Sequence, residues 1–192
     1  MKFVKLLLAT ALMTASISPA LANPVVKILG ASYGGTGCPD RSASVSVSPD
    51  GQELTILFDK FAAQGNVSTQ SRKSCNLSIP IKVPQGYQIS IYDADYRGYV
   101  APRTTGNLRA EYFFAGARGP VFNRNLSGET NYNVRDSLAT VANVWSRCGD
   151  SVNMRVNAAM TARGAGMATV DTKSGYHTPV MMAKKNPSLV FV

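Results

Sequence analysis

The sequence predicts an all-β, single-domain antiparallel β-sandwich with a jelly-roll-like arrangement. Apolar and polar residues alternate along many short segments, which is the period of a half-buried strand. Turn residues separate these segments at intervals of about ten residues, as in sandwiches and jelly rolls. No segment of useful length shows the 3.6-residue period of an amphipathic helix. These three observations fix the class as all-β.

Residues 75–100 form the best-specified element. The first half places five apolar side chains on one face: Cys75, Leu77, Ile79, Ile81 and Val83. The second half, from Tyr87, is another strand, whose apolar face changes at Tyr92 as a β-bulge would change it. Pro84-Gln85-Gly86 lies between them, so we expect an antiparallel hairpin at the centre of the core.

The other predicted strands follow the same alternation, with weaker patterns near both ends of the chain. They cover residues 25–29, 42–48, 52–61, 108–115, 137–145, 152–162, 167–171, 180–183 and 189–192. Residues 62–74 are polar and are expected to be a connection. Residues 116–136 are rich in Gly and Asn, and we expect a long loop there, of a length that is usually functional or mobile.

Residues 1–22 have the features of a secretory signal peptide. Lys2 and Lys5 give a positive start, residues 6–17 are too short to span a bilayer, and Ala20-Leu21-Ala22 fits the cleavage rule. We therefore expect a single domain at residues 23–192, in a secreted or periplasmic protein without a transmembrane segment. An uncleaved N-terminal anchor is the alternative interpretation.

The charge balance favours anionic partners. The chain has 20 Lys and Arg against 11 Asp and Glu, a net charge of +9, and loses Lys2 and Lys5 with the signal peptide. In an exported protein this indicates cell-wall polymers, lipopolysaccharide or acidic polysaccharide as partners. The basic residues are scattered and form no nucleic-acid signature. The simpler interpretation is that the charge serves solubility.

Residues that could carry catalysis are few. His177 is the single histidine, the cysteines are dispersed and no phosphate-binding loop is present, so we predict no cofactor and no metal site. Asp93 and Asp95 share one strand face, and with Glu111 either could hydrolyse a glycosidic bond. A polar strand face completed by Arg97 is the simpler interpretation.

Aromatic and arginine residues alternate along two neighbouring predicted strands. Aromatic rings can stack on sugars, and guanidinium groups bind carboxylates and hydroxyls. The predicted binding residues are Asp93, Asp95, Arg97, Tyr99, Arg103, Arg118 and Arg124. The alternative is that about half of these aromatic residues are core and the charges form a solvated face.

Three cysteines in an exported chain predict one disulfide and one remaining thiol. All three pairings are open from the spacing. Cys38 and Cys148 both lie in glycine-flanked turns that can adapt to the bridge, which favours that pair. Cys75 shares its face with Leu77, which favours a buried thiol.

Ordered blocks of residues carry a family resemblance. They include Gly35-Thr36-Gly37-Cys38-Pro39, Arg72-Lys73-Ser74-Cys75, Asp95-Tyr96-Arg97-Gly98-Tyr99, Tyr112-Phe113-Phe114-Ala115-Gly116 and Val144-Trp145-Ser146-Arg147-Cys148-Gly149. The chain resembles the secreted family of domain of unknown function 4360 from bacteria and fungi. The resemblance implies secretion, one β-rich domain and no assigned activity, and it places all three cysteines in family motifs. Arg147 stands where the family usually has Pro, and residues 186–192 lack the aromatic, basic end of bacterial members.

The resulting hypothesis is a secreted, non-catalytic β-sandwich that binds a cell-surface glycan or another anionic polymer. One alternative is a polysaccharide hydrolase with paired carboxylates, and another is a structural protein of the envelope. The oligomeric state is left open.

Overall fold

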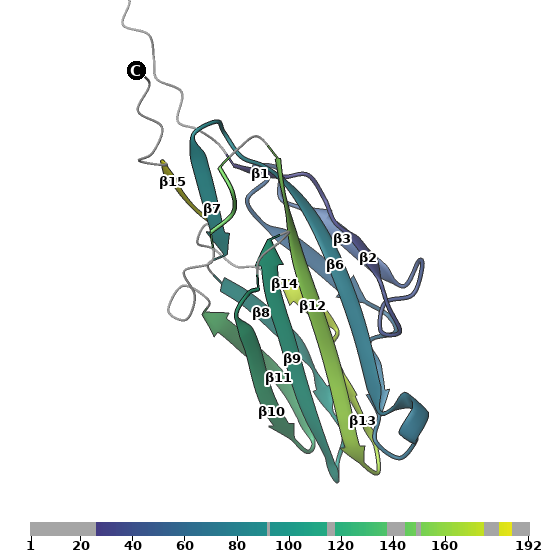
Figure 1. Ribbon diagram of the computed structural model, residues 1–192. Coiled ribbons are helices and arrows are strands. Elements are labelled where there is room, and N and C mark those ends of the chain that lie inside the picture. The colour runs from purple at the N-terminus through teal and green to yellow at the C-terminus, as the bar shows by residue number, and fades with distance from the viewer. Residues whose placement is uncertain are drawn as a thin grey trace, which may run out of the picture.

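The chain folds into two antiparallel sheets, and the prediction of an all-β sandwich is confirmed (Figure 1). The computed structural model describes residues 26–91, 93–114, 118–137, 145–148, 151–174 and 181–185. Within these ranges the secondary structure is fifteen strands and the short 3-10 helix η1 (Ser68–Gln70).

The first sheet, called sheet A here, is built on three long neighbouring strands (Figure 1). Its order is β1 (Lys27–Ile28), β6 (Arg72–Lys82), β12 (Ser151–Gly164), β9 (Thr104–Phe114) and β10 (Val121–Ser127), and β2 (Ser32–Gly34) also pairs with β6. The strand β12 is paired along nearly its whole length on both sides, so it is the centre of this sheet.

The second sheet, called sheet B here, consists of shorter strands. Its order is β3 (Ala43–Val47), β4 (Leu54–Phe58), β14 (Thr172–Ser174), β8 (Asp93–Val100), β13 (Met167–Thr169) and β5 (Ala62–Gln64), and β11 (Thr130–Ser137) pairs with β8. A separate two-stranded sheet joins β7 (Tyr87–Ile91) to β15 (Met181–Lys185).

The core lies between the inner faces of sheets A and B. The period of two in each strand sends its apolar residues inward and its polar residues outward. Fully buried side chains from both sheets include Ile56, Leu77, Ile79, Ile81, Tyr96, Val100, Leu108, Tyr112, Val156 and Met160. The Tyr96 and Tyr112 hydroxyls meet at 2.5 Å, which joins β8 of sheet B to β9 of sheet A. The outer faces of the two sheets therefore point away from each other.

The predicted hairpin at residues 75–100 is wrong in its pairing. The turn itself forms, because the Tyr87 backbone N–H donates to the Pro84 carbonyl oxygen and Gly86 has a φ of 80°. However, β6 pairs with β1, β2 and β12, whereas β7 pairs with β15 and β8 belongs to sheet B. Alternation defines which face of a strand is buried but not which strand lies beside it. The expected bulge at Tyr92 lies outside the described residues, at the break between β7 and β8.

The predicted loop at residues 116–136 is also wrong. Its described part holds two strands, β10 and β11, which pair with β9 and β8 in different sheets. Each has a single described neighbour, and in β10 Leu126 alone is buried. β10 has solvent on both faces for most of its length, so it lacks the alternation that reveals a strand. β11 does alternate, with Tyr132 and Val134 on its inner face, but two apolar residues among polar ones give too weak a signal. The connection expected at residues 62–74 likewise contains β5, η1 and the start of β6.

Several predictions concern residues outside the described ranges. The signal peptide at residues 1–22, the strand expected at 189–192 and His177 lie outside the described residues, as does most of the strand expected at 137–145. Among the residues that are described, no helix has the length and apolar character needed to cross a membrane.

The disulfide links Cys38 to Cys75, so the predicted Cys38–Cys148 pair is wrong. The Gly37 backbone N–H donates to the Ser74 carbonyl oxygen at 2.8 Å, which holds Cys38 against the start of β6. The two Cα atoms are 5.3 Å apart, within the usual bridging range. Cys148 is a half-buried free thiol. Its neighbour Ser146 bonds to Ile89 of β7, which places it beside a different strand.

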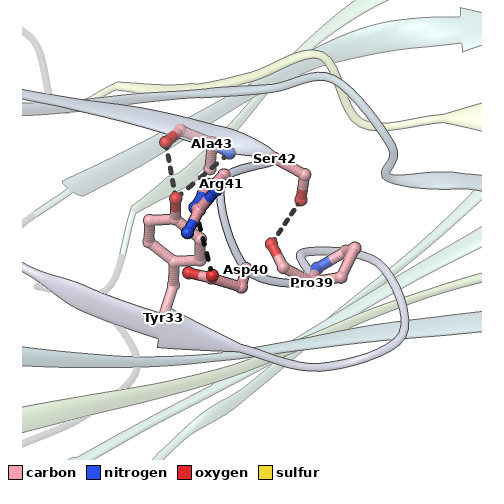
Figure 2. Close-up of polar contacts among 6 residues, drawn as sticks. All are labelled: Tyr33, Pro39, Asp40, Arg41, Ser42 and Ala43. Atoms are coloured by element: carbon pink, nitrogen blue, oxygen red, sulfur yellow. Dashed lines mark hydrogen bonds and ion pairs between the residues drawn. The ribbon is translucent and has the colours of Figure 1, made fainter.

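The loop between β2 and β3 is fixed by its own polar contacts (Figure 2). The Tyr33 hydroxyl donates to the Ala43 carbonyl oxygen at 2.8 Å, and the Ser42 hydroxyl donates to the Pro39 carbonyl oxygen at 2.7 Å. Asp40 and Arg41 form an ion pair at the tip, where both side chains are more than nine-tenths exposed. Such a pair contributes little to stability.

Candidate functional site

The structure distributes the predicted binding residues over several surfaces. Their positions differ in sheet and direction: Asp93, Asp95, Arg97 and Tyr99 on the outer face of β8, Arg103 in the β8–β9 turn with a φ of 53°, Arg118 before β10, and Arg124 within β10. Only the four on β8 form a continuous row. The seven residues therefore do not constitute one site.

At one end of the row on β8, the carboxylates have a structural role. Asp95 is buried and accepts two hydrogen bonds from Arg135 of β11, at 2.9 Å from Nε and 3.1 Å from Nη2. This bidentate pair fixes β11 beside β8. Asp93, two residues before Asp95 on the same face of β8, is also buried. The polar-face interpretation describes this pair of carboxylates better than a catalytic one.

The paired-carboxylate hydrolase does not fit this geometry. Glu111 lies on the outer face of sheet A, where its carboxylate is 3.1 Å from Arg109 Nη2. Asp95 lies on the outer face of sheet B. Packed sheets are about 10 Å apart before side chains are counted, and the two carboxylates of a glycosidase flank one bond at roughly 5–9.5 Å. Among the described residues, no cluster of three or more His, Cys, Asp or Glu could hold a metal ion.

A second polar surface is the outer face of sheet A. Most of its outward side chains are amides, hydroxyls and guanidiniums, and those that we group here are exposed or half-buried. We call this surface the asparagine face, and it consists of Arg72, Asn76, Ser78, Thr105, Asn107, Arg109, Glu111, Phe113, Asn123, Asn125, Ser127, Asn153, Arg155, Asn157, Thr161 and Arg163.

Hydrogen bonds orient three of the amides of this face. Asn107 Nδ2 donates to Asn123 Oδ1 at 2.6 Å and to Asn125 Oδ1 at 2.7 Å. The register explains the contact, because Asn125 lies directly opposite Asn107 on the neighbouring strand. Since each amide has two N–H donors and one oxygen, this network leaves the Nδ2 groups of Asn123 and Asn125 for other acceptors.

The asparagine face is hollowed at one end. A cavity of about 560 Å³ is lined by Thr105, Gly106, Asn107, Asn125, Leu126, Ser127, Thr161 and Arg163. Its lining comes from β9, β10 and β12, so three neighbouring strands of one rigid sheet position its polar groups. Such a cavity offers hydroxyls, amides and one guanidinium to a ligand.

Arginine residues follow the asparagine face at regular steps. Arg109 pairs with Ala159, which lies four residues from Arg155 and four from Arg163 along β12. At roughly 3.3 Å per residue, the backbone positions of Arg155, Arg109 and Arg163 are about 13 Å apart along the strand direction. Arg72 lies opposite Thr161, close to the level of Arg163. Glu111 is the one acidic side chain of this face, and Arg109 already neutralises it. The surface is therefore net positive.

A different polar cluster, called the interior cluster here, lies in the core and consists of Tyr96, Tyr112, Asp136 and Lys173. Lys173 Nζ is 5.4 Å from the centroid of the Tyr112 ring and 6.0 Å from that of Tyr96. Asp136 Oδ2 is buried and has no hydrogen-bond partner among the described residues. No sugar-sized ligand can reach these groups in the folded core, so the cluster belongs to the scaffold.

Burial displaces the pKa values of the interior cluster. It raises the pKa of Asp136 to about 6, although a hydrogen bond from Tyr112 opposes the shift, and the nearby charge of Asp93 adds to it. Burial lowers the pKa of Lys173 to about 7, against the attraction of Asp136. Burial also raises the pKa of Tyr96 and of Tyr112. These directions follow from the cost of burying charge.

Sequence reasoning missed the asparagine face for a local reason. The composition of residues 116–136 predicts a loop, which leaves Asn123 and Asn125 without a place in a sheet. The available signal was the alternation of Asn153, Arg155 and Asn157 with apolar residues, which marks the outward face of β12.

The chain matches the family described as Domain of unknown function (DUF4360) over residues 24–185, and it belongs to that family. An uncharacterized secreted protein from Arthroderma benhamiae is 34% identical over 167 residues, covering 77% of this chain. The chain spans 65% of the length of that relative. The family resemblance and the expected secreted or periplasmic location are thereby confirmed.

Solved structures with low similarity include two carbohydrate-binding modules. TmCBM61, in complex with beta-1,4-galactotriose, has a TM-score of 0.33 and 10% identity, with 83% of this chain and 90% of that chain covered. A family 11 module from Clostridium thermocellum, in complex with a beta-1,3-1,4-mixed-linked tetrasaccharide, has a TM-score of 0.24 and 11% identity, with 78% and 94% covered. These likenesses carry no argument about what this chain binds.

Proposed function

We propose that this secreted protein is a non-catalytic binding protein that holds an acidic extracellular polysaccharide against the asparagine face. The observation that carries the proposal is the hydrogen-bonded amide network of Asn107, Asn123 and Asn125 beside the cavity that contains Arg163. Fixed amides are suited to sugar hydroxyls because they donate and accept hydrogen bonds on the same group.

The guanidinium groups supply the preference for acidic sugars. Arg155 and Arg163 are exposed, lie at two ends of the face and can bind carboxylates with two parallel hydrogen bonds. A polymer with carboxylates at intervals can contact several of these positions at once. Neutral polymers would use the amides and hydroxyls alone.

One aromatic ring also lies on this face. Phe113 is half-buried and pairs with Arg155 across β9 and β12. Its outward position allows a sugar ring to pack against it while the neighbouring guanidinium binds an oxygen. Since the face is formed by long central strands, binding requires little rearrangement of the backbone.

Affinity electrophoresis of the mature chain tests the proposal, with polygalacturonate and neutral β-1,4-galactan as ligands. We expect retardation by polygalacturonate, and a loss of about tenfold or more in affinity for the Asn107→Ala/Arg163→Gln variant. Each charge-assisted hydrogen bond contributes about 1.5–3 kcal/mol, and about 1.4 kcal/mol corresponds to a tenfold change.

Arg41→Gln is the matched control, because the Arg41 side chain is more than nine-tenths exposed in the β2–β3 loop (Figure 2) and lies outside the asparagine face. It removes one positive charge with no loss of binding expected. Failure of wild type to bind polygalacturonate, alginate and a sulfated glycan contradicts the proposal. Equal loss in both variants would instead indicate attraction by net charge alone.

A further inference from the structure

A second hollow lies on the opposite outer face of the molecule. It has a volume of about 470 Å³ and is lined by Arg97, Gly98, Asn131, Tyr132, Asn133 and Asp171. These residues come from β8, β11 and the segment between β13 and β14, all on the side of sheet B. Three of the predicted residues, Asp95, Arg97 and Tyr99, lie in or beside this hollow.

The register of β8 and β11 builds the polar lining of this hollow. Asn131 lies opposite Tyr99, and Asn133 lies opposite Arg97. The next pair, Arg135 with Asp95, is fixed by two hydrogen bonds and holds β11 in place. As a result, two exposed amides lie beside an exposed guanidinium, which repeats the chemistry of the asparagine face.

Close packing forms the floor of the hollow. A side chain at Gly98 would approach the Thr169 carbonyl oxygen at 2.2 Å and the Tyr132 hydroxyl at 2.6 Å. The Tyr132 hydroxyl donates to the same Thr169 oxygen at 2.5 Å. Glycine at this position therefore leaves room for the Tyr132 side chain, whose hydroxyl reaches from β11 across β8 to Thr169 of β13.

The charges of this hollow differ from those of the asparagine face. Arg97 and Asp171 both line it, and the Asp171 backbone N–H donates to the Arg97 carbonyl oxygen at 2.8 Å. A site with one cation, one anion and two amides suits the hydroxyl groups of one sugar together with a single carboxylate, whereas the asparagine face can bind several carboxylates along a polymer.

We propose that this hollow, the sheet B site, is a second polysaccharide-binding site, so that one copy of the protein bridges two polymer strands. The inference rests on the proposed function of the asparagine face and adds a cross-linking activity to it. Because the two sites lie on opposite outer faces, a single short stretch of polymer cannot occupy both. Occupation of both sites by different strands therefore cross-links those strands.

Light scattering and viscosity of polygalacturonate solutions, titrated with mature protein, test this inference. Wild type should raise both until the sites saturate and then lower them as excess protein occupies every strand singly. The Asn131→Ala/Asn133→Ala variant should bind polymer in affinity electrophoresis with less than about twofold change but produce no cross-linking. These two side chains are exposed, so the variant is expected to fold.

The asparagine-face variant Asn107→Ala/Arg163→Gln should bind polymer about tenfold or more weakly and produce no cross-linking, and sedimentation should show that wild type is monomeric without polymer. Cross-linking that persists in the Asn131→Ala/Asn133→Ala variant overturns the second site and assigns bridging to self-association. Binding by wild type without any cross-linking also overturns it, while leaving the proposed function intact. Absence of binding by wild type overturns both proposals.

Discussion

The interior cluster and the asparagine face contain similar polar groups in opposite surroundings. In the interior, Lys173 and Asp136 are cut off from water and their pKa values move toward each other. On the asparagine face, Asn107, Asn123 and Asn125 are accessible to solvent and form hydrogen bonds with one another. Burying a polar group costs desolvation free energy, so its hydrogen bonds become important for stability, whereas an exposed polar group remains available to a ligand.

This difference predicts a division of labour between the two regions. Substitutions in the core should change the free energy of unfolding and leave binding per folded molecule unchanged. Substitutions on the asparagine face should do the reverse.

Loss of the disulfide should have the largest effect. Replacing Cys38 and Cys75 together by Ala should reduce the free energy of unfolding by about 3–4 kcal/mol, because the bridge closes a loop with a sequence separation of 37. Urea denaturation of the mature protein measures this. Cys148→Ala is the control, and it should change the free energy of unfolding only by the packing contacts that the Cys148 side chain loses. Equal stability of the double variant and wild type would contradict the assigned pairing.

The titration of Asp136 and Lys173 in the interior cluster should make the free energy of unfolding depend on pH. The pKa of Asp136 is raised from 3.8 to about 6 in the folded state, so its contribution is full below pH 3.8 and is lost as pH rises through 6. The pKa of Lys173 is lowered from 10.5 to about 7, so its penalty is full below pH 7 and is relieved as pH rises toward 10.5. These two groups together give a stability minimum between about pH 6 and 7.

Lys173→Met isolates the alkaline part of this profile. The variant should lose the rise in stability between pH 7 and 10.5, whatever its stability at neutral pH. Denaturation midpoints at several pH values provide the measurement, and Lys60→Met, in a connection between strands, is a control for removing a lysine. An unchanged slope in the Lys173 variant would show that this amine does not titrate in the core.

Removal of one interior hydroxyl should have a smaller effect. Tyr112→Phe deletes the partner of the Tyr96 hydroxyl and a donor to Asp136, and it should reduce stability by about 1–3 kcal/mol. Tyr33→Phe removes a half-buried hydroxyl bonded to the Ala43 carbonyl oxygen and serves as the comparison (Figure 2). Polymer binding at a temperature where both variants are folded should match wild type.

The fold was predictable from the sequence to the extent that alternation reports burial. It identified β6, β9 and β12, because each has a wet face and a dry face, as in the run Val152, Met154 and Val156. It could not pair β6 with β12, since residues about 80 positions apart come together only through the packing of the whole sandwich. The burial of Lys173 could not be predicted either, because lysine side chains are almost always exposed.

The candidate sites were predictable only in part. The residues on β8 were recognised because arginine and aromatic residues alternate there, and they adjoin the sheet B site. The asparagine face required β10, whose strand character depends on pairing with β9 rather than on its own sequence. The bridge between Cys38 and Cys75 depends on a backbone contact between Gly37 and Ser74, which no spacing rule indicates.

The most direct test of the central claim is an NMR titration of the mature protein with galacturonic acid oligomers. We expect chemical-shift changes in the side-chain amides of Asn107, Asn123 and Asn125 and in the guanidinium of Arg163, with no change at Tyr96 or Tyr112. Changes that avoid these four side chains, or no changes at saturating oligomer, would contradict the assignment of polysaccharide binding to the asparagine face.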